Sequence, residues 1–239
     1  MNGLGIVAAL AAETRPLGRT LPRGEELATL ADGTLLVVSG MGPAAAAQGA
    51  RQLLAAGAQA LISWGMAGGL DPALEAGTLV LPSEVISPGG GHFFTADHWR
   101  EPLCAALAHA HPLCCGRLLS SREVIGTAAD KARAFQQTRA SAVDMESLAI
   151  AEVAARARVP FLAVRAIVDT AGDAVPASLI EAAAGAAPVR IGRLVGSLAR
   201  TPADTLALVR LARGYRAASR ALAAVALSGA LAPPVSPAA

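Results

Sequence analysis

A chain of 239 residues is long enough to bury one large α/β core, because single hydrophobic cores stop growing at about 250 to 300 residues. Hydrophobic residues make up 54% of the chain and aromatic residues only 3%, which argues against the aromatic platforms that bind nucleic acid. The formal net charge of +2 hides an asymmetry, because residues 190–239 hold seven arginines and a single acidic residue, Asp204.

Short apolar runs rich in leucine and β-branched residues alternate with longer alanine-rich segments. The runs predict strands at 4–10, 34–39, 60–64, 78–86 and 160–168. The segments predict helices at 43–56, 102–110, 128–137 and 145–157. Such alternation is typical of a parallel sheet, and continuous apolar runs are typical of strands covered on both faces. We therefore expect one α/β domain over residues 1–239, with a mixed, mainly parallel central sheet flanked by helices.

Two charge-free stretches, 33–50 and 52–70, are each about long enough to cross a bilayer. Glycine and proline interrupt both, which is typical of a strand, a loop and a helix rather than of one membrane helix. The first residues lack the basic start of a signal peptide. The three cysteines, Cys104, Cys114 and Cys115, form no CxxC pair. These features predict a cytoplasmic protein with reduced thiols.

A basic amphipathic helix is expected at about 202–227, where a proline in the first turn and an acid near the positive end mark its start. At 100° per residue, four arginines share one side: Arg210, Arg213, Arg216 and Arg220. Apolar residues share the opposite side: Leu208, Leu211, Tyr215, Ala218 and Leu222. The apolar side indicates a contact with the core or a dimer partner. The basic side indicates either a solvated surface or peripheral contact with the inner membrane face.

Three acidic residues directly follow apolar runs, namely Glu13, Glu146 and Asp169. In open α/β sheets, ligands bind in the crevice at the carboxyl ends of the strands. Each acid alone is more often a helix cap or a solvated residue of a turn. Their recurrence at equivalent strand ends makes them candidate functional residues.

Two glycine motifs follow predicted strands. Gly40–Ala45 reads GxGxxA and resembles a dinucleotide fingerprint, but no acid for the ribose hydroxyls occurs in the next strand before Asp71. We therefore expect a glycine turn whose amides approach an anion or a sugar. The second motif, 65–69, is expected to be a flexible loop at the same crevice. The four histidines show no metal-ligand spacing, and the chain has no GxSxG elbow or Walker loop.

The segment Val143–Glu146, followed by Val164–Asp169, resembles the signature of nucleoside phosphorylases and of methylthioadenosine/adenosylhomocysteine nucleosidases. SGMG at 39–42, GMAGGL at 65–70 and Glu13 fall in that family's order. The resemblance implies cleavage of the bond between a purine and a ribose, with no metal and no cofactor. It also implies a homodimer or higher homo-oligomer.

Within that superfamily, Thr127 to Lys131 leading into AVDMES, together with RAIVDTAGDAVP, most resembles the hopanoid-associated branch. Members of that branch remove adenine from adenosylhopane to give ribosylhopane. The implied substrate is therefore an adenosyl compound that carries a lipid tail. The basic tail of the chain is compatible with such a substrate.

The resemblance also implies roles for individual residues. Asp169 would protonate the departing purine, and Glu13 would orient or deprotonate the attacking water. Glu146 would hold the ribose hydroxyls, and Met145 would pack on the sugar. The further candidate substrate-binding residues are Val124, Ile125, Gly42, Met66 and Gly68.

Two departures from the family pattern concern Val168 and Met66, where its nucleosidases usually carry serine. Phosphorylases begin with a Gly-Asp-Pro loop and a phosphate-binding arginine, whereas this chain has Ala11-Ala12-Glu13. Because a carboxylate there would repel phosphate, water is the expected nucleophile. Arg15 could reverse this preference by binding phosphate as a co-substrate. Three hypotheses remain open: an adenosylhopane nucleosidase, a phosphorylase or general nucleosidase, and a non-catalytic nucleotide-binding or membrane-docking protein.

Overall fold

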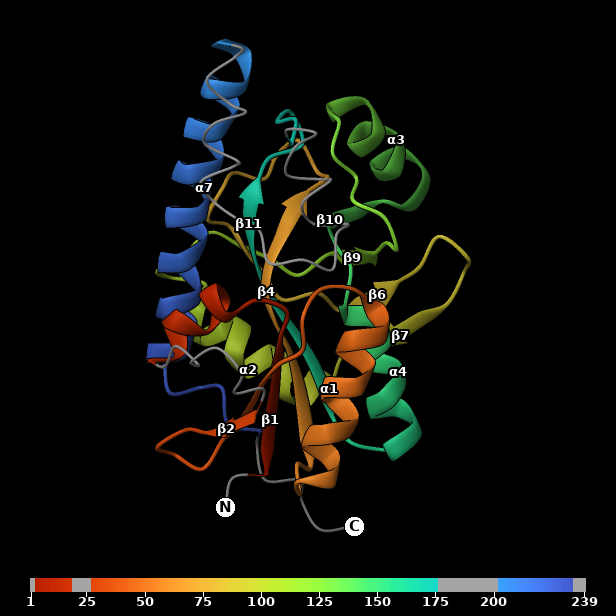
Figure 1. The fold of residues 1–239 in the computed structure, drawn as a ribbon, viewed down its shortest axis with the longest axis vertical. Coiled ribbons are helices and arrows are strands. Elements are labelled where there is room, and N and C mark those ends of the chain that lie inside the picture. The colour runs from red at the N-terminus through yellow and green to blue at the C-terminus, as the bar shows by residue number, and fades with distance from the viewer. Residues whose placement is uncertain (1–2, 19–26, 176–201, 234–239) are drawn as a thin grey trace.

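A mixed and mainly parallel sheet runs through the centre of the molecule, as a computed structural model that describes residues 3–18, 27–175 and 202–233 shows (Figure 1). Its strand order is β2-β3-β1-β4-β10-β9-β6-β7, with β11 paired to β4 and β5, and β5 paired to β8. The strands are β1 (Leu4–Ala8), β2 (Leu27–Thr29), β3 (Leu35–Val38), β4 (Ala60–Gly69), β5 (Leu79–Val80), β6 (Glu84–Ile86), β7 (His92–Phe94), β8 (Leu113–Cys114), β9 (Arg117–Ser120), β10 (Ala140–Asp144) and β11 (Phe161–Asp169).

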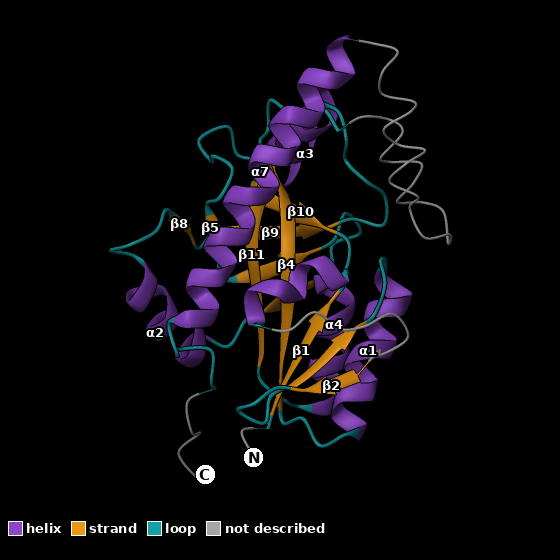
Figure 2. Cartoon of the chain, turned by 60° about the vertical axis from the view of Figure 1, so that its left-hand side comes forward, coloured by secondary structure: helices purple, strands orange, loops and turns teal. Residues whose placement is uncertain are grey.

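Helices cover both faces of this sheet. They are the 3₁₀ helix η1 (Ala11–Leu17) and the α-helices α1 (Pro43–Ala55), α2 (Asp97–Leu107), α3 (Ala128–Thr138), α4 (Ser147–Ala157) and α7 (Pro202–Leu227). In Figure 1, α1 and α4 lie together on the right, and α7 runs down the left side. Figure 2 shows α7 crossing in front of β11. The expected α/β fold with helices on both faces of a mixed sheet is confirmed.

The continuous apolar runs contribute side chains to two hydrophobic clusters, one on each face of the sheet. Ile6 and Ile62 belong to the cluster under α2 and α7, whereas their chain neighbours Val7 and Leu61 belong to the cluster under α1 and α4. Because successive side chains of a strand point to opposite faces, a strand buried on both faces is apolar at nearly every position.

The motif at 65–69 is not the flexible loop that the sequence predicted. These residues are the second half of β4 and pair with β11 and β10. Gly65 has φ of +152°, and a Cβ there would lie 2.5 Å from Oε1 of Glu13. Glycine is therefore required for close approach of the strand to that carboxylate, not for loop flexibility.

Several predicted boundaries are also corrected. The single strand expected at 78–86 is two short strands, β5 and β6, because the chain leaves β11 after Val80 and joins β9 at Glu84. The helix expected at 102–110 begins earlier, at Asp97, and ends at Leu107.

Helix α7 packs its apolar side against the core. Ala218, Leu222 and Val225 are fully buried there, and Leu211 and Tyr215 are partly buried. The four arginines Arg210, Arg213, Arg216 and Arg220 are exposed. The side chain of Leu208 lies outside the described residues. At Gly214 the helix backbone comes so close to the carbonyl oxygen of Val168 that no side chain fits between them.

The described residues also bear on membrane insertion and on metal binding. None of the helices described is both long and apolar enough to cross a membrane. Among the residues of the described ranges, no group of three or more histidine, cysteine, aspartate or glutamate side chains could hold a metal ion.

Candidate active site

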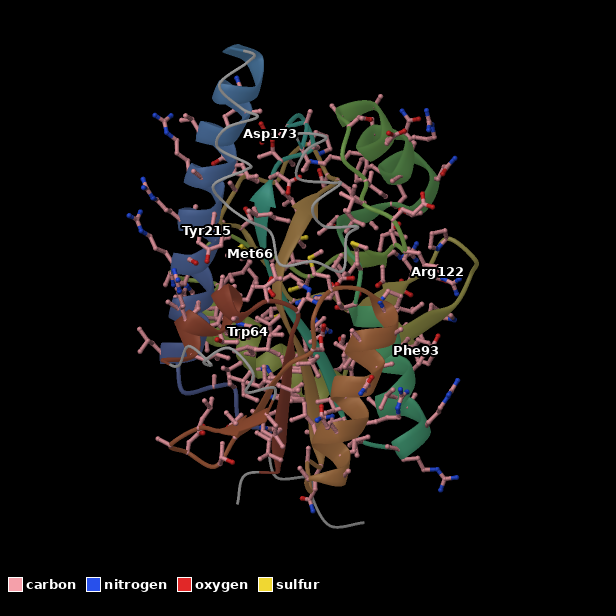
Figure 3. The ribbon with its side chains drawn as sticks, in the orientation of Figure 1. Trp64, Met66, Phe93, Arg122, Asp173 and Tyr215 are labelled. Carbon is pink, nitrogen blue, oxygen red and sulfur yellow. The ribbon has the colours of Figure 1, made fainter. Side chains whose placement is uncertain are left out.

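A cavity of about 200 Å³ lies where β1, β10 and β11 end beside β4. Its lining includes eight of the nine predicted site residues: Glu13, Met66, Gly68, Val124, Ile125, Met145, Glu146 and Asp169. These residues come from segments far apart in the chain, as expected for the carboxyl ends of neighbouring strands. Figure 3 shows Met66 near the middle of the molecule, between α7 and the helices of the opposite side.

Glu13 is held by the backbone of two segments. Its Oε1 accepts the N–H of Met66 at 2.9 Å, and its Oε2 accepts the N–H of Leu10 at 3.0 Å. Burial raises the pKa of Glu13, although Arg165 and these backbone donors act to lower it. A carboxylate with a raised pKa is a stronger base, which suits removal of a proton from water.

Glu146 stands at the N-cap of α4 but its side chain does not cap that helix. Oε1 accepts the N–H of Gly42 at 2.8 Å. Gly42, the ninth predicted site residue, therefore holds Glu146 and is not among the residues that line the cavity. Burial, together with the neighbouring Asp144, raises the pKa of Glu146 to about 7. This carboxyl group can exchange hydrogen bonds with sugar hydroxyls in either protonation state.

Arg165 lies beneath these acids and was missed by the sequence analysis. Its Nε and Nη2 donate to Oδ2 of Asp144 at 2.9 and 2.6 Å, and Nη2 also donates to Ser63 and Ser147. Burial acts to lower its pKa, but the carboxylates of Asp144, Glu13 and Glu146 outweigh it and raise the pKa. One arginine thus compensates three buried carboxylates, which explains a charge inside the apolar run FLAVRAIV.

Asp169, the last residue of β11, lines the cavity and pairs with Lys131 of α3. Nζ of Lys131 donates to Oδ2 of Asp169. Burial raises the pKa of Asp169, and Lys131 opposes that rise without cancelling it. A carboxyl group with a raised pKa keeps a proton closer to neutral pH, as an acid catalyst must. Lys131 was not singled out as a functional residue from the sequence.

The two positions that depart from the family pattern line the cavity, whereas Arg15 and the four histidines do not. Val168 and Met66, which replace the serines of the family pattern, both line the cavity. Arg15 is exposed on η1 and is not among the lining residues. His92, His98, His109 and His111 do not line it either.

A second cavity of about 630 Å³ adjoins the first, and the two share Glu123 and Met145. Its wall combines Ser87–Gly89, Ser120–Glu123 and the start of α4. Arg122, labelled at the right of Figure 3, belongs to this wall. The two cavities together could hold a ligand larger than a nucleoside.

Comparison with known proteins identifies relatives of this chain. A family model described as "Phosphorylase superfamily" matches residues 4–199. The 5′-methylthioadenosine/S-adenosylhomocysteine nucleosidase of Neisseria meningitidis, in complex with methylthio-immucillin-A, is 18% identical, with a TM-score of 0.68 over 95% of this chain and 97% of that one.

Two further solved structures share the fold. The futalosine hydrolase of Helicobacter pylori strain 26695 is 16% identical, with a TM-score of 0.68 and coverage of 95% and 97%. A 5′-methylthioadenosine/S-adenosylhomocysteine nucleosidase of Colwellia psychrerythraea 34H, in complex with adenine, is 20% identical, with a TM-score of 0.67 and coverage of 95% of both chains. No curated protein matches the sequence.

Proposed function

Because the chain belongs to the phosphorylase superfamily, we propose that it is an N-glycosidase that releases adenine from an adenosyl compound by hydrolysis. The observation that carries this proposal is the convergence of Glu13, Glu146 and Asp169 on one cavity of about 200 Å³. Their pKa values are all raised, chiefly by burial. Carboxyl groups with raised pKa values that line one cavity are typical of active sites.

The proposed reaction breaks the C1′–N9 bond of the nucleoside and forms a bond between C1′ and a water oxygen. The purine leaves with the bonding electrons, and Asp169 donates a proton to its ring nitrogen. Glu13 accepts a proton from the attacking water, and Glu146 holds the ribose hydroxyls. The transition state resembles an oxocarbenium ion, so an acid at the leaving group and a carboxylate near the nucleophile both accelerate the reaction.

Water, rather than phosphate, is the nucleophile in this proposal. None of the described residues that line the smaller cavity is a lysine or an arginine. Arg165 is 3% exposed, and its guanidinium donates hydrogen bonds to Asp144 and to two serine hydroxyls. Phosphate binding ordinarily uses unpaired cations or several free backbone N–H groups. A phosphate-dependent phosphorylase is therefore the second candidate.

The proposed substrate carries a large substituent on the 5′ carbon of the ribose, with adenosylhopane as the specific candidate. Met145, which is proposed to pack on the sugar, lines both cavities. A substituent that leaves the sugar beside Met145 would enter the space of about 630 Å³. The 3′ and 2′ hydroxyls would remain on the side of Glu146.

A lipid-tailed substrate resides in a bilayer, and α7 would bring the enzyme to it. The four exposed arginines of α7 could be attracted to anionic headgroups, each contributing about 1 kcal/mol near the surface. The apolar side of α7 is occupied by the core, so this contact would be electrostatic and would not insert the helix.

We further propose a homodimer or higher homo-oligomer. β7 is the last strand of the sheet order, and Phe94 on it is 70% exposed. A second copy could cover this exposed apolar side chain. Light scattering at micromolar concentration would reveal the assembly, and a monomer throughout would refute it.

The function is tested by incubating the purified protein with 5′-methylthioadenosine, with and without phosphate. Adenine and a free sugar in both cases would support hydrolysis. Formation of 5-methylthioribose 1-phosphate, only when phosphate is present, would favour the second candidate. Absence of adenine both with and without phosphate would refute both enzymatic candidates and leave a binding protein.

A further inference from the structure

The acid proposed to protonate the purine is paired with a lysine that is unusual in this chain. Of the 20 lysines and arginines in the sequence, Lys131 is the only lysine. Its side chain is 0% exposed. Buried lysines are rare, because an ammonium group loses its hydration when it is removed from water. Lys131 must therefore be compensated by the groups around it.

The compensation is complete. Nζ donates to Oδ2 of Asp169, to the carbonyl oxygen of Thr170 at 2.7 Å and to the carbonyl oxygen of Asp173 at 2.9 Å. An ammonium group has three N–H donors, so each has an acceptor. A guanidinium has five donors in a planar fork and would leave some of them unpaired in this buried space. This difference explains a lysine in a chain that otherwise uses arginine.

The contact with Lys131 gives the two carboxylate oxygens of Asp169 different surroundings. Oδ2 is occupied by Lys131, whereas within the described part of the chain no hydrogen bond reaches Oδ1. Asp169 lines the cavity, while Lys131 does not. One oxygen is therefore anchored and the other is free to meet a ligand.

We propose that Lys131 is the positioning residue of the acid step: its ammonium anchors Oδ2 of Asp169 so that Oδ1 meets the purine, and its charge controls how readily that carboxyl group keeps a proton. This inference rests on the proposed function. Lys131 does not touch the substrate and acts through Asp169.

Electrostatics gives the direction of the effect. Burial raises the pKa of Asp169, Lys131 lowers it, and Asp173 raises it. Arg210 of α7 lies 3.8 Å from Asp173 and offsets part of that negative charge. A positive charge in direct contact with a carboxyl group, as Lys131 is with Asp169, lowers the pKa of that carboxyl group by about 1 to 3 units. Without Lys131, Asp169 would therefore hold its proton to a higher pH. Among the described residues, the other charged side chains that line the cavity around Asp169 are Glu13, Glu123, Asp144 and Glu146.

The test is the pH profile of kcat for Lys131→Met with 5′-methylthioadenosine. The acid works only when protonated, so activity falls as pH rises through its pKa. The alkaline limb of the variant should lie about 1 to 3 pH units above that of the wild type. A lower kcat with an unmoved alkaline limb would show a purely structural lysine and overturn the proposal. Arg133→Met removes an exposed cation two residues along α3 and should leave the limb in place.

A second measurement covers the case in which Lys131→Met does not fold. With ¹⁵N-labelled lysine, the folded wild type gives one side-chain ammonium signal, because the sequence has one lysine. The chemical shift of that signal should change with pH, with the same midpoint as the alkaline limb of kcat. Asp169→Asn should abolish this pH-dependent change. A signal whose chemical shift does not change at that midpoint would overturn the proposal. If the wild type releases no adenine, the proposed function fails. The pH-dependent change of the lysine signal, and its loss in Asp169→Asn, would still show whether the charge of Asp169 acts on Lys131.

Discussion

The backbone N–H of Gly42 donates a 2.8 Å hydrogen bond to Glu146, 104 positions further along the chain. In a dinucleotide-binding protein the amides of such a glycine turn would approach a pyrophosphate. Here this donor is bound by a carboxylate of the protein itself. The GxGxxA motif at Gly40–Ala45 therefore positions a side chain of the candidate site.

Replacing Asp169 with asparagine should lower the rate of adenine release about 10²-fold or more in a chain that still folds, with a lower melting temperature because the buried ammonium of Lys131 loses its counter-charge. The amide has the same volume as the carboxyl group but cannot donate the proton. The rate is measured with saturating 5′-methylthioadenosine, and the melting temperature serves as the control. Wild-type activity in Asp169→Asn would refute its role as acid.

Glu13→Gln should also lower hydrolysis about 10²-fold or more, because the amide cannot accept the proton of water. Oε1 of glutamine can still accept the N–H of Met66, whereas its amide NH2 cannot accept the N–H of Leu10, so one of the two backbone contacts is kept. Added phosphate should not stimulate the wild type. Strict dependence on phosphate would contradict the assignment of water as nucleophile.

Glu146→Gln should weaken substrate binding, seen as a raised KM, while stabilising the free protein at alkaline pH. The wild-type pKa of about 7 exceeds the ordinary 4.5, so the folded state binds this proton more tightly than the unfolded chain. Wild-type stability should then fall as pH rises from about 4.5 through about 7. The gain of the variant, measured by urea unfolding, should vanish at the acid end of this window. A gain that is the same at every pH would show that the charge is not responsible.

Gly214→Ala should destabilise the protein, although alanine is the better helix former. The added methyl group would collide with the carbonyl of Val168, next to Asp169, and push α7 away from β11. Overpacking of this kind costs about 1 to 3 kcal/mol. Arg213→Ala, at the exposed neighbouring position, is the control and should change the free energy of unfolding little. Equal stability of both variants would contradict this close packing.

Arg210 is kept in this test, because it lies 3.8 Å from Asp173 and so acts on the charge beside Asp169. Replacing Arg213, Arg216 and Arg220 together with glutamine should weaken binding to anionic vesicles and slow turnover of a lipid-tailed substrate. Cleavage of 5′-methylthioadenosine should be unchanged, since these side chains do not line either cavity. Unchanged vesicle binding and equal activity on both substrates would leave a solvated basic surface as the only explanation.

The sequence predicted what depends on local pattern. Apolar runs predicted β1, β3 and β11 within a few residues, because a strand buried on both faces is apolar at nearly every position. The acids after these runs converge on one cavity because parallel strands end at the same edge.

What the sequence could not predict depends on tertiary contacts. Glycine at 65–69 has low strand propensity, and only pairing with β10 and β11 makes this segment a strand. Arg165 and Lys131 are buried because partners distant in the chain compensate their charges. Their signals were present, as a charge within an apolar run and as a single lysine, but neither signal names the partner.

The most direct test of the central claim is the reaction of 5′-methylthioadenosine in ¹⁸O-labelled water without phosphate, followed by mass spectrometry of both products. We expect free adenine and a sugar with one ¹⁸O at the anomeric carbon, detected before solvent exchange, and loss of both products in Asp169→Asn. No adenine, or adenine released at the wild-type rate by Asp169→Asn, would contradict the account.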